Sequence, residues 1–251
     1  MHPRIEFRHN PLKVVVVQFK FAALYGLTEP ASLAAFQRVL GERFPKAPPR
    51  MQQVTVEIKN EGGLASNVSL GPVRLSSDDG TWLVNIAPDS ISLETTAYES
   101  WADFRARLEV VAGAMPLRPA VATRIGVRYV DHIQAPGIGA SLEWQPYIAP
   151  ALLGARDGLV FDERLVQGLQ QLSFAIGEDI VNVRHGYVKN EAAAEFPSTY
   201  LIDTDLFTEV EQPFEMPAIL ARIERYHDWA WSLFRRSITP AAVTLLGGVE
   251  S

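Results

Sequence analysis

The segment that decides the start of the fold is a β-branched and aromatic run, Val14-Val15-Val16-Val17-Gln18-Phe19-Lys20-Phe21. This composition, with Pro11 shortly before it, predicts a strand that is buried on at least one face. The hydrophobic spacing then changes, because after Pro30 apolar residues recur every three or four positions, at Leu33, Phe36, Leu40 and Phe44. That spacing predicts an amphipathic helix, so the chain opens with a strand followed by a helix.

The next part of the chain alternates apolar and polar residues. Strands are expected over residues 51–60, 68–76, 81–87 and 91–96, with turn-forming Gly, Asp and Pro residues between them. We therefore expect an antiparallel meander here. A helix should follow from Ser100, which is placed to cap it, and its apolar stripe would be Trp101, Phe104, Leu108, Val111 and Met115.

A similar order begins again near residue 120. The sequence predicts a strand over 120–134, a short helix around 142–153, strands near 166–176, 179–189 and 199–207, and a long helix starting near Met216. Each half thus consists of a strand, a helix, several strands and a second helix. In such a layout, one antiparallel sheet packs its apolar face under helices.

The fold class predicted from this order is α+β, with two pseudo-repeated β-α-β(3-4)-α halves whose antiparallel sheets are covered by helices. The order resembles that of the TBP-like and helix-grip folds. Residues 1–10 would be an N-terminal extension, 11–117 the first half, 118–246 the second half and 247–251 a tail, with one core shared by the halves. The expected core comprises Val15, Val17, Phe19, Phe36, Trp101, Phe104, Leu108, Ile125, Val127, Ile219, Ile223 and Phe234.

Composition excludes several classes of function. The net charge of −6 opposes non-specific attraction to nucleic acid or to anionic lipid. The absence of cysteine rules out disulfides, zinc-thiolate sites and a thiol nucleophile. No segment approaches the roughly 20 apolar residues that span a bilayer, and Val14 to Val17 is too short a run for a signal-peptide core. We therefore expect a cytoplasmic protein that does not enter a membrane.

One constellation could carry binding chemistry. Along the strand from residue 121 to residue 133, side chains alternate, so that Arg124, Arg128 and His132 share one face. Asp203 and Asp205 share a face of the strand over 199–207 and could meet those arginines. The alternatives are a solvated or ion-paired face and a site for an anion or a partner; the paired carboxylates are also a weak metal signal.

The last predicted helix carries two further candidates. His227 lies on its apolar side, where a histidine is usually a hydrogen-bonded core residue; the alternative would join it with His132 or His185 in a proton-transfer or metal site. Trp229 and Trp231 lie two residues apart, about 200° around a helix, so both cannot face the core. Trp229 is therefore a candidate for a contact surface.

No catalytic motif is found. The sequence has no HExxH pair, no phosphate-binding lysine loop and no G-x-S-x-G elbow. We accordingly assign no catalytic residue, no metal site and no cofactor, and the sequence favours a protein that is not an enzyme.

Several stretches together resemble a sporadically distributed family of bacterial and archaeal proteins of about this length. They are Pro11-Leu12-Lys13-Val14-Val15, Tyr98 with Trp101 and Phe104, the strand Arg124-Ile125-Gly126-Val127-Arg128-Tyr129-Val130-Asp131-His132-Ile133, Leu201-Ile202-Asp203-Thr204-Asp205, and His227 with Phe234, Ile238, Thr239 and Pro240. The resemblance implies an architecture and no mechanism. Patchy distribution is a habit of accessory genes, including toxin-antitoxin and phage-defence cassettes, and implies that context.

These observations leave three hypotheses of function. The first is a non-catalytic interaction module, a partner or specificity subunit of an accessory operon that binds another protein. The second is a small-ligand-binding or hydrolytic protein with a pocket between a curved sheet and the C-terminal helix. The third is nucleic-acid binding through the basic row, which the net charge opposes.

Overall fold

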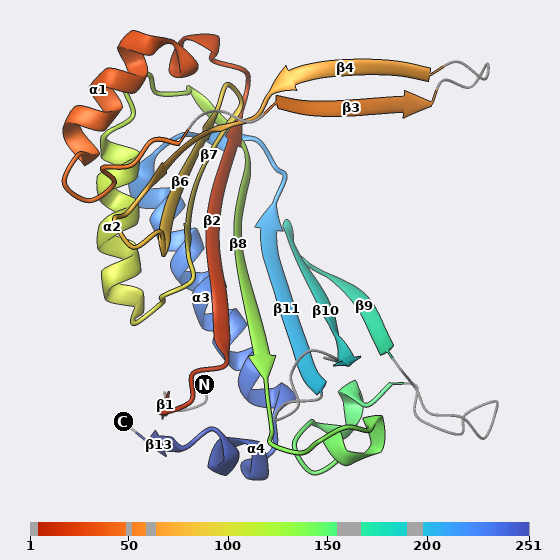
Figure 1. Ribbon diagram of the computed structural model, residues 1–251. Helices are drawn as coiled ribbons and strands as arrows, with labels where there is room; N and C mark the ends of the chain where they lie inside the picture. Colours follow the sequence, from red (N-terminus) through yellow and green to blue (C-terminus); the bar gives the residue numbers. More distant parts are fainter. Residues whose placement is uncertain (1–4, 49–51, 59–63, 155–166, 190–197, 251) are drawn as a thin grey trace. The chain divides into compact units, whose positions relative to one another are not determined.

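The computed structural model describes residues 5–48, 52–58, 64–154, 167–189 and 198–250, with no side-chain detail for 52–58 and 64–70. The protein is α+β, with a large antiparallel sheet and a few helices (Figure 1). It divides into two compact units, which we describe separately. Unit 1 comprises Met1–Val16, Ile125–Val210 and Pro217–Ser251, and unit 2 comprises Val17–Arg124 and Glu211–Met216. No helix of the described chain is long and apolar enough to cross a membrane.

Unit 2 is built on strands that neighbour one another in the order β5-β6-β7-β2. Its helices α1 and α2 lie over one face of these strands (Figure 1), and Trp82 of β6 packs against Phe104 of α2 with ring centroids 5.6 Å apart. The elements are β2 (Leu12–Phe21), η1 (Tyr25–Thr28), α1 (Pro30–Leu40), β3 (Gln52–Ile58), β4 (Leu64–Leu70), β5 (Val73–Ser76), β6 (Trp82–Ala87), β7 (Ser90–Thr95), α2 (Trp101–Gly113) and β12 (Gln212–Pro213).

Unit 1 is built on strands in the order β8-β11-β10-β9, and α3 lies along one face of them. Its short strands β1 and β13 pair with each other. The elements are β1 (Ile5–Phe7), β8 (Val121–Ile133), η2 (Ser141–Trp144), η3 (Pro150–Leu152), β9 (Gln167–Ile176), β10 (Asp179–Lys189), β11 (Ser198–Thr208), α3 (Met216–Ser237), α4 (Pro240–Leu245) and β13 (Gly248–Glu250).

The sequence located most of these elements. The capping of α2 is as expected, since the Ser100 side chain accepts a hydrogen bond from the Asp103 amide at 3.2 Å. Every residue of the expected core is buried except Trp101, which is half-buried at the start of α2. The first turn of this helix is therefore more open to solvent than its apolar spacing predicts.

Two predicted elements differ from the structure. The expected strand over 68–76 is two strands, β4 and β5, because Gly71 and Pro72 interrupt the ladder. β3 and β4 then form a separate two-stranded sheet, so that only β5, β6 and β7 make the expected meander. The expected helix over 142–153 is also wrong: that stretch holds the 3₁₀ turns η2 and η3 with Pro146 between them.

A buried carboxylate joins α3 to the sheet of unit 1. Asp179, at the start of β10, accepts hydrogen bonds from the Tyr226 hydroxyl at 2.5 Å and from Arg225 at 3.0 Å, and it also pairs with Arg222. Because a buried carboxylate is stable only when its oxygens are satisfied, these partners position α3 on β10. The C-terminal end of α3 packs into a hydrophobic core that includes Ile133, Trp144, Tyr187, Tyr200, Ile202, Phe234 and Ile238.

Candidate functional site

An apolar groove of about 620 Å³ runs along unit 1 between the sheet and the C-terminal half of α3. The sheet side is formed by aliphatic and aromatic residues of β9, β10 and β11, and the other side by α3 and the turn at η3. The lining residues are Ala149, Ala151, Leu152, Leu172, Phe174, Ile176, Val181, Val183, Leu206, Trp229, Ser232, Leu233, Arg236 and Ser237.

The groove exists because the apolar face of the sheet extends beyond the helix that covers it. Val181 of β10 is directly opposite Phe174 of β9, so both side chains lie on the same face. Val181 is 4% exposed, whereas Phe174 is 49% exposed and Ile176 is 48% exposed. Exposed apolar side chains that form one contiguous surface mark an interaction site more often than scattered ones do.

Trp229, the aromatic candidate from the sequence, lies on the α3 wall of this groove. The Arg225 guanidinium lies 5.5 Å from its ring centroid, and the Tyr226 ring lies 6.0 Å away. Arg236 is the one charged residue among those that line the groove. The groove therefore offers apolar and aromatic surface with a positive charge at one end.

On the opposite face of the same sheet, Arg128 is bound to Asp203. Two hydrogen bonds of 2.7 Å join the guanidinium to both carboxylate oxygens, and Arg184 of β10 approaches the same carboxylate at 3.6 Å. Of the alternatives left open for this row, the ion-paired one is therefore found at Arg128, whose guanidinium is bound to a carboxylate of β11. Asp205 is opposite Arg128 in the strand register and lines the same shallow hollow of about 210 Å³.

The other members of the predicted row are not brought into that hollow. Arg124 lies in unit 2, where its guanidinium donates to the Gln18 side chain at 3.3 Å. His132 is half-buried; burial and the nearby Lys13 lower its pKa, against an opposing effect of Asp203. Since two carboxylates accompany Arg128 and Arg184, the hollow is balanced in charge.

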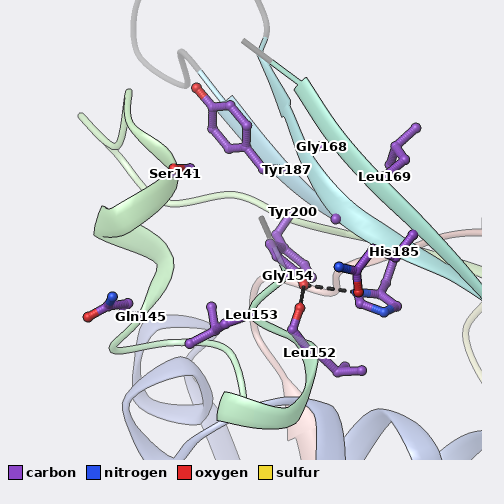
Figure 2. Close-up of a pocket in the computed structure, with 12 residues that line it drawn as sticks. Ser141, Gln145, Leu152, Leu153, Gly154, Gly168, Leu169, His185, Tyr187 and Tyr200 are labelled. Atoms are coloured by element: carbon purple, nitrogen blue, oxygen red, sulfur yellow. Dashed lines mark hydrogen bonds between the residues drawn. The ribbon is translucent and has the colours of Figure 1, made fainter. Parts of the chain in front are cut away.

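A second, smaller cavity of about 70 Å³ lies at the other end of β10, where His185 and Tyr200 line it (Figure 2). The Tyr200 hydroxyl donates to the Leu152 carbonyl at 2.6 Å and lies 3.1 Å from His185 Nδ1. Because a phenol has a single proton, Nδ1 must be the donor in the second bond. Burial also lowers the pKa of His185, which favours the neutral ring with its proton on Nδ1.

The hydrogen-bonded series of His185, Tyr200 and Leu152 connects the small cavity to the apolar groove. Leu152 lines both the small cavity and the apolar groove, so the bond from Tyr200 fixes one part of the groove wall. His185 Nε2 is buried without a hydrogen-bond partner among the described residues. Through the Tyr200 hydroxyl, the His185 ring is linked to the Leu152 carbonyl, so the pair is positioned to support η3.

His132, His185 and His227, which were considered for a shared site, do not share hydrogen-bond partners in the described part of the chain. His227 Nδ1 and the Tyr129 hydroxyl are 2.9 Å apart, so His227 is hydrogen-bonded as a core histidine is expected to be, although it is half-buried rather than buried. His185 bonds to Tyr200 instead. Across the described residues, no group of three or more His, Cys, Asp or Glu side chains is arranged to hold a metal ion.

The sequence was compared with known proteins. No protein-family model matches the chain, and no curated protein matches it. The candidate site therefore has to be judged from its own geometry.

Sequence reasoning found Trp229 but missed the other wall of the groove. The strand β9 was located, but nothing in the sequence analysis predicted that its apolar residues would line a groove. A signal was present: no charged residue occurs over Gln167–Ile176, although 21% of the whole chain is charged. An edge strand without charge is unusual when it faces only water.

Proposed function

We propose that this protein is a non-catalytic interaction module whose groove between β9 and α3 receives a segment of another protein. One observation carries the proposal: Phe174 and Ile176 are about half exposed on the same face as buried residues of β10, and Trp229 faces them across the groove. Aromatic and aliphatic residues of this kind are the usual anchors of protein interfaces.

The chemistry of the groove specifies what the partner segment should look like. Its lining is mostly apolar, with Ser232, Ser237 and the single charged residue Arg236, so the segment should present apolar side chains and one acidic residue near the end of α3. A segment with several basic residues would leave charges against apolar surface and against Arg236. The net charge of −6 of the whole chain favours a partner with a basic surface around that segment.

The context for such a partner is an accessory operon of the toxin-antitoxin or phage-defence type, which is the setting implied by the family resemblance. In that setting, the partner would be encoded beside this protein, and this chain would act as a specificity or partner subunit.

The proposal is tested by co-expressing the chain with each neighbouring gene product and purifying the complex. We expect a complex with one of them that Trp229→Ala weakens about tenfold or more, because an aromatic anchor at an interface contributes about 2 kcal/mol or more. Arg236→Glu should weaken it as well. Val39→Glu, which changes an exposed apolar residue of α1 in unit 2, is the matched control and should have no effect.

Two results would reject the proposal. One is that the chain purifies without a partner after co-expression with each of the neighbouring gene products. The other is a complex that Trp229→Ala and Arg236→Glu leave unchanged, since the partner would then use another surface.

A second candidate is the binding of an apolar small molecule in the same groove. The volume of about 620 Å³ falls in the range of small-molecule pockets, and the place between sheet and C-terminal helix is that of helix-grip proteins. The groove is open along one side, which favours a protein segment over a small molecule as its occupant. This candidate would be favoured if a fluorescent apolar probe bound the unchanged chain with micromolar affinity and did not bind the Trp229→Ala variant.

Nucleic-acid binding has less support. Arg128 and Arg184 share the carboxylate of Asp203, so the face of the predicted basic row is balanced in charge around them. Phosphate recognition needs an excess of positive charge. We therefore expect that the protein does not shift the mobility of nucleic acid in a gel at any salt concentration, low salt included.

We also infer that the two halves are a duplication of the helix-grip type. In the first half, the opening strand β2 neighbours the last strand of the meander, β7; in the second half, β8 neighbours β11 in the same way. Each meander is followed by a long helix, α2 or α3. This shared connection supports the inference, although the first half carries the extra hairpin β3-β4 and the second has turns where α1 would be.

A further inference from the structure

The outer edge of β9 is a second surface, distinct from the face that lines the groove. Among the described strands, β9 pairs with β10 alone, so the N–H and C=O groups on its other side have no ladder partner. All ten residues, Gln167–Ile176, pair one-to-one with β10 without a bulge. Every one of them is exposed except Gly168, which is partly so.

Within the strand itself, this edge lacks the features by which proteins prevent edge strands from pairing. Such features are charged side chains, proline, bulges and short strands. β9 contains none of them over its length of ten residues. The edge strand of unit 2 differs: β5 has only four residues, includes Arg74, and is bridged at Ser76 by Lys46.

The sequence of β9 is complementary to itself in an antiparallel pair. A two-fold axis perpendicular to the sheet keeps each side chain on its own face, so residues of the same parity must lie opposite one another. The axis must then pass through either Gln171 or Leu172 if most of the strand is to pair. Both registers place large side chains opposite small ones.

With Gln171 on the axis, Gly168 lies opposite Phe174 of the second copy and Leu169 opposite its Ser173. With Leu172 on the axis, Gly168 lies opposite Ile176 of the second copy and Leu169 opposite its Ala175. A large side chain across from a strand glycine covers the exposed backbone and stabilises the pair. No charge is brought against its own copy in either register, since the strand has none.

We propose that β9 pairs with β9 of a second copy of this chain, antiparallel about a two-fold axis, and that the protein is thereby a homodimer. The inference does not depend on a protein partner in the groove, because it uses the backbone edge of β9. Pairing would bring Leu172, Phe174 and Ile176 of the two copies onto one continuous sheet face. The two grooves would then be presented together, as a two-fold symmetric surface.

The test uses opposite charges at Gln171, which lies on the face of β9 away from the groove and lies at or next to the axis in both registers. Light scattering after size-exclusion chromatography should show a dimer for the unchanged chain. Gln171→Lys alone and Gln171→Glu alone should each weaken the dimer at least about tenfold, because like charges would face each other at an interface. Mixing the two variants should restore a dimer that contains one copy of each, detected by native mass spectrometry.

Gln37→Lys in α1 of unit 2 is the matched control and should remain dimeric. If either Gln171 variant melts at a lower temperature than the unchanged chain, the pair Ser173→Lys and Ser173→Glu replaces them on the same face. An unchanged chain that is monomeric at about 0.1 mM overturns the proposal, as does a dimer that persists in both charged variants. Trp229→Ala should leave the dimer intact, so a failure of the groove proposal is seen separately.

Discussion

Arg128 and Asp203 are held together by two parallel hydrogen bonds of 2.7 Å, with the carboxylate almost completely buried and the guanidinium half exposed. We expect Arg128→Ala to lower the free energy of unfolding by about 1–3 kcal/mol, because a buried carboxylate loses its main partner. Arg184, at 3.6 Å, retains part of the interaction. Urea denaturation measures the loss.

The same variant should leave partner affinity unchanged, since the charge of Arg128 is already committed within the protein. Arg184→Ala is the control and should cost less than Arg128→Ala. If Arg128→Ala weakened a complex without changing stability, the guanidinium would instead be a recognition group.

The stability of the protein should depend on pH through Asp131. Burial, assisted by the nearby Asp203, raises the pKa of the Asp131 carboxyl to about 7, from an ordinary value of 3.8. Between these values, the folded protein holds a proton that the unfolded chain has released, so stability falls as pH rises from about 4 to about 7. Above that window, the penalty is constant.

Asp131→Asn removes this penalty. The free energy of unfolding of the variant relative to the unchanged chain should therefore increase between pH 4 and pH 7 and then level off, with a total change on the order of 2–4 kcal/mol. Urea denaturation at a series of pH values provides the measurement. A difference that does not vary with pH would show that Asp131 is ionised in the folded protein.

Tyr200 should be a stabilising residue that also shapes the groove. Tyr200→Phe leaves the Leu152 carbonyl and His185 Nδ1 without their partner, at a cost of about 1–3 kcal/mol. Because Leu152 lines the groove, the variant should also weaken the complex that the groove forms. Thermal unfolding and the binding assay together check this; a change in neither would mean that the hydrogen bonds are replaced by water.

His227 is expected to be structural. His227→Ala removes the 2.9 Å bond to the Tyr129 hydroxyl, which belongs to a buried residue, and should lower stability by about 1–3 kcal/mol. A double-mutant cycle with Tyr129→Phe isolates the pair, and a coupling energy of zero would contradict the expectation. Lost binding at unchanged stability would assign His227 to a site.

Local pattern was sufficient for most elements and insufficient for the site. The buried residues of β10 and α3 can be recognised by the regular spacing of apolar residues, as Val181, Val183 and Ile223 show, because burial on one face imposes that spacing. Phe174 and Ile176 show the same spacing in β9, yet they are exposed. Periodicity tells which face is apolar but not how far a covering helix reaches, since that depends on strand order and on the direction of α3.

The binding partners of polar groups were predicted unevenly for a related reason. Asp203 was a plausible partner for Arg128 because both lie on long strands with clear alternation. The cluster around Asp179 was missed, because it joins the start of a strand to one turn of a helix more than 40 residues later in the sequence. Such contacts depend on the packing of elements, for which a single sequence carries no periodic signal.

The pairing of β1 with β13 has a practical consequence for protein engineering. Ile5 lies opposite Glu250 in the ladder, and paired strands have Cα atoms only about 5 Å apart. A linker of a few glycine and serine residues could therefore connect β13 to β1 in a variant that runs from Ile5 to Glu250, and that variant could be reopened at a surface turn such as the one at Gly80 to give a circular permutant. A fluorescent donor on β1 and an acceptor on β13 would lie close together, and their energy transfer would report when this short ladder opens.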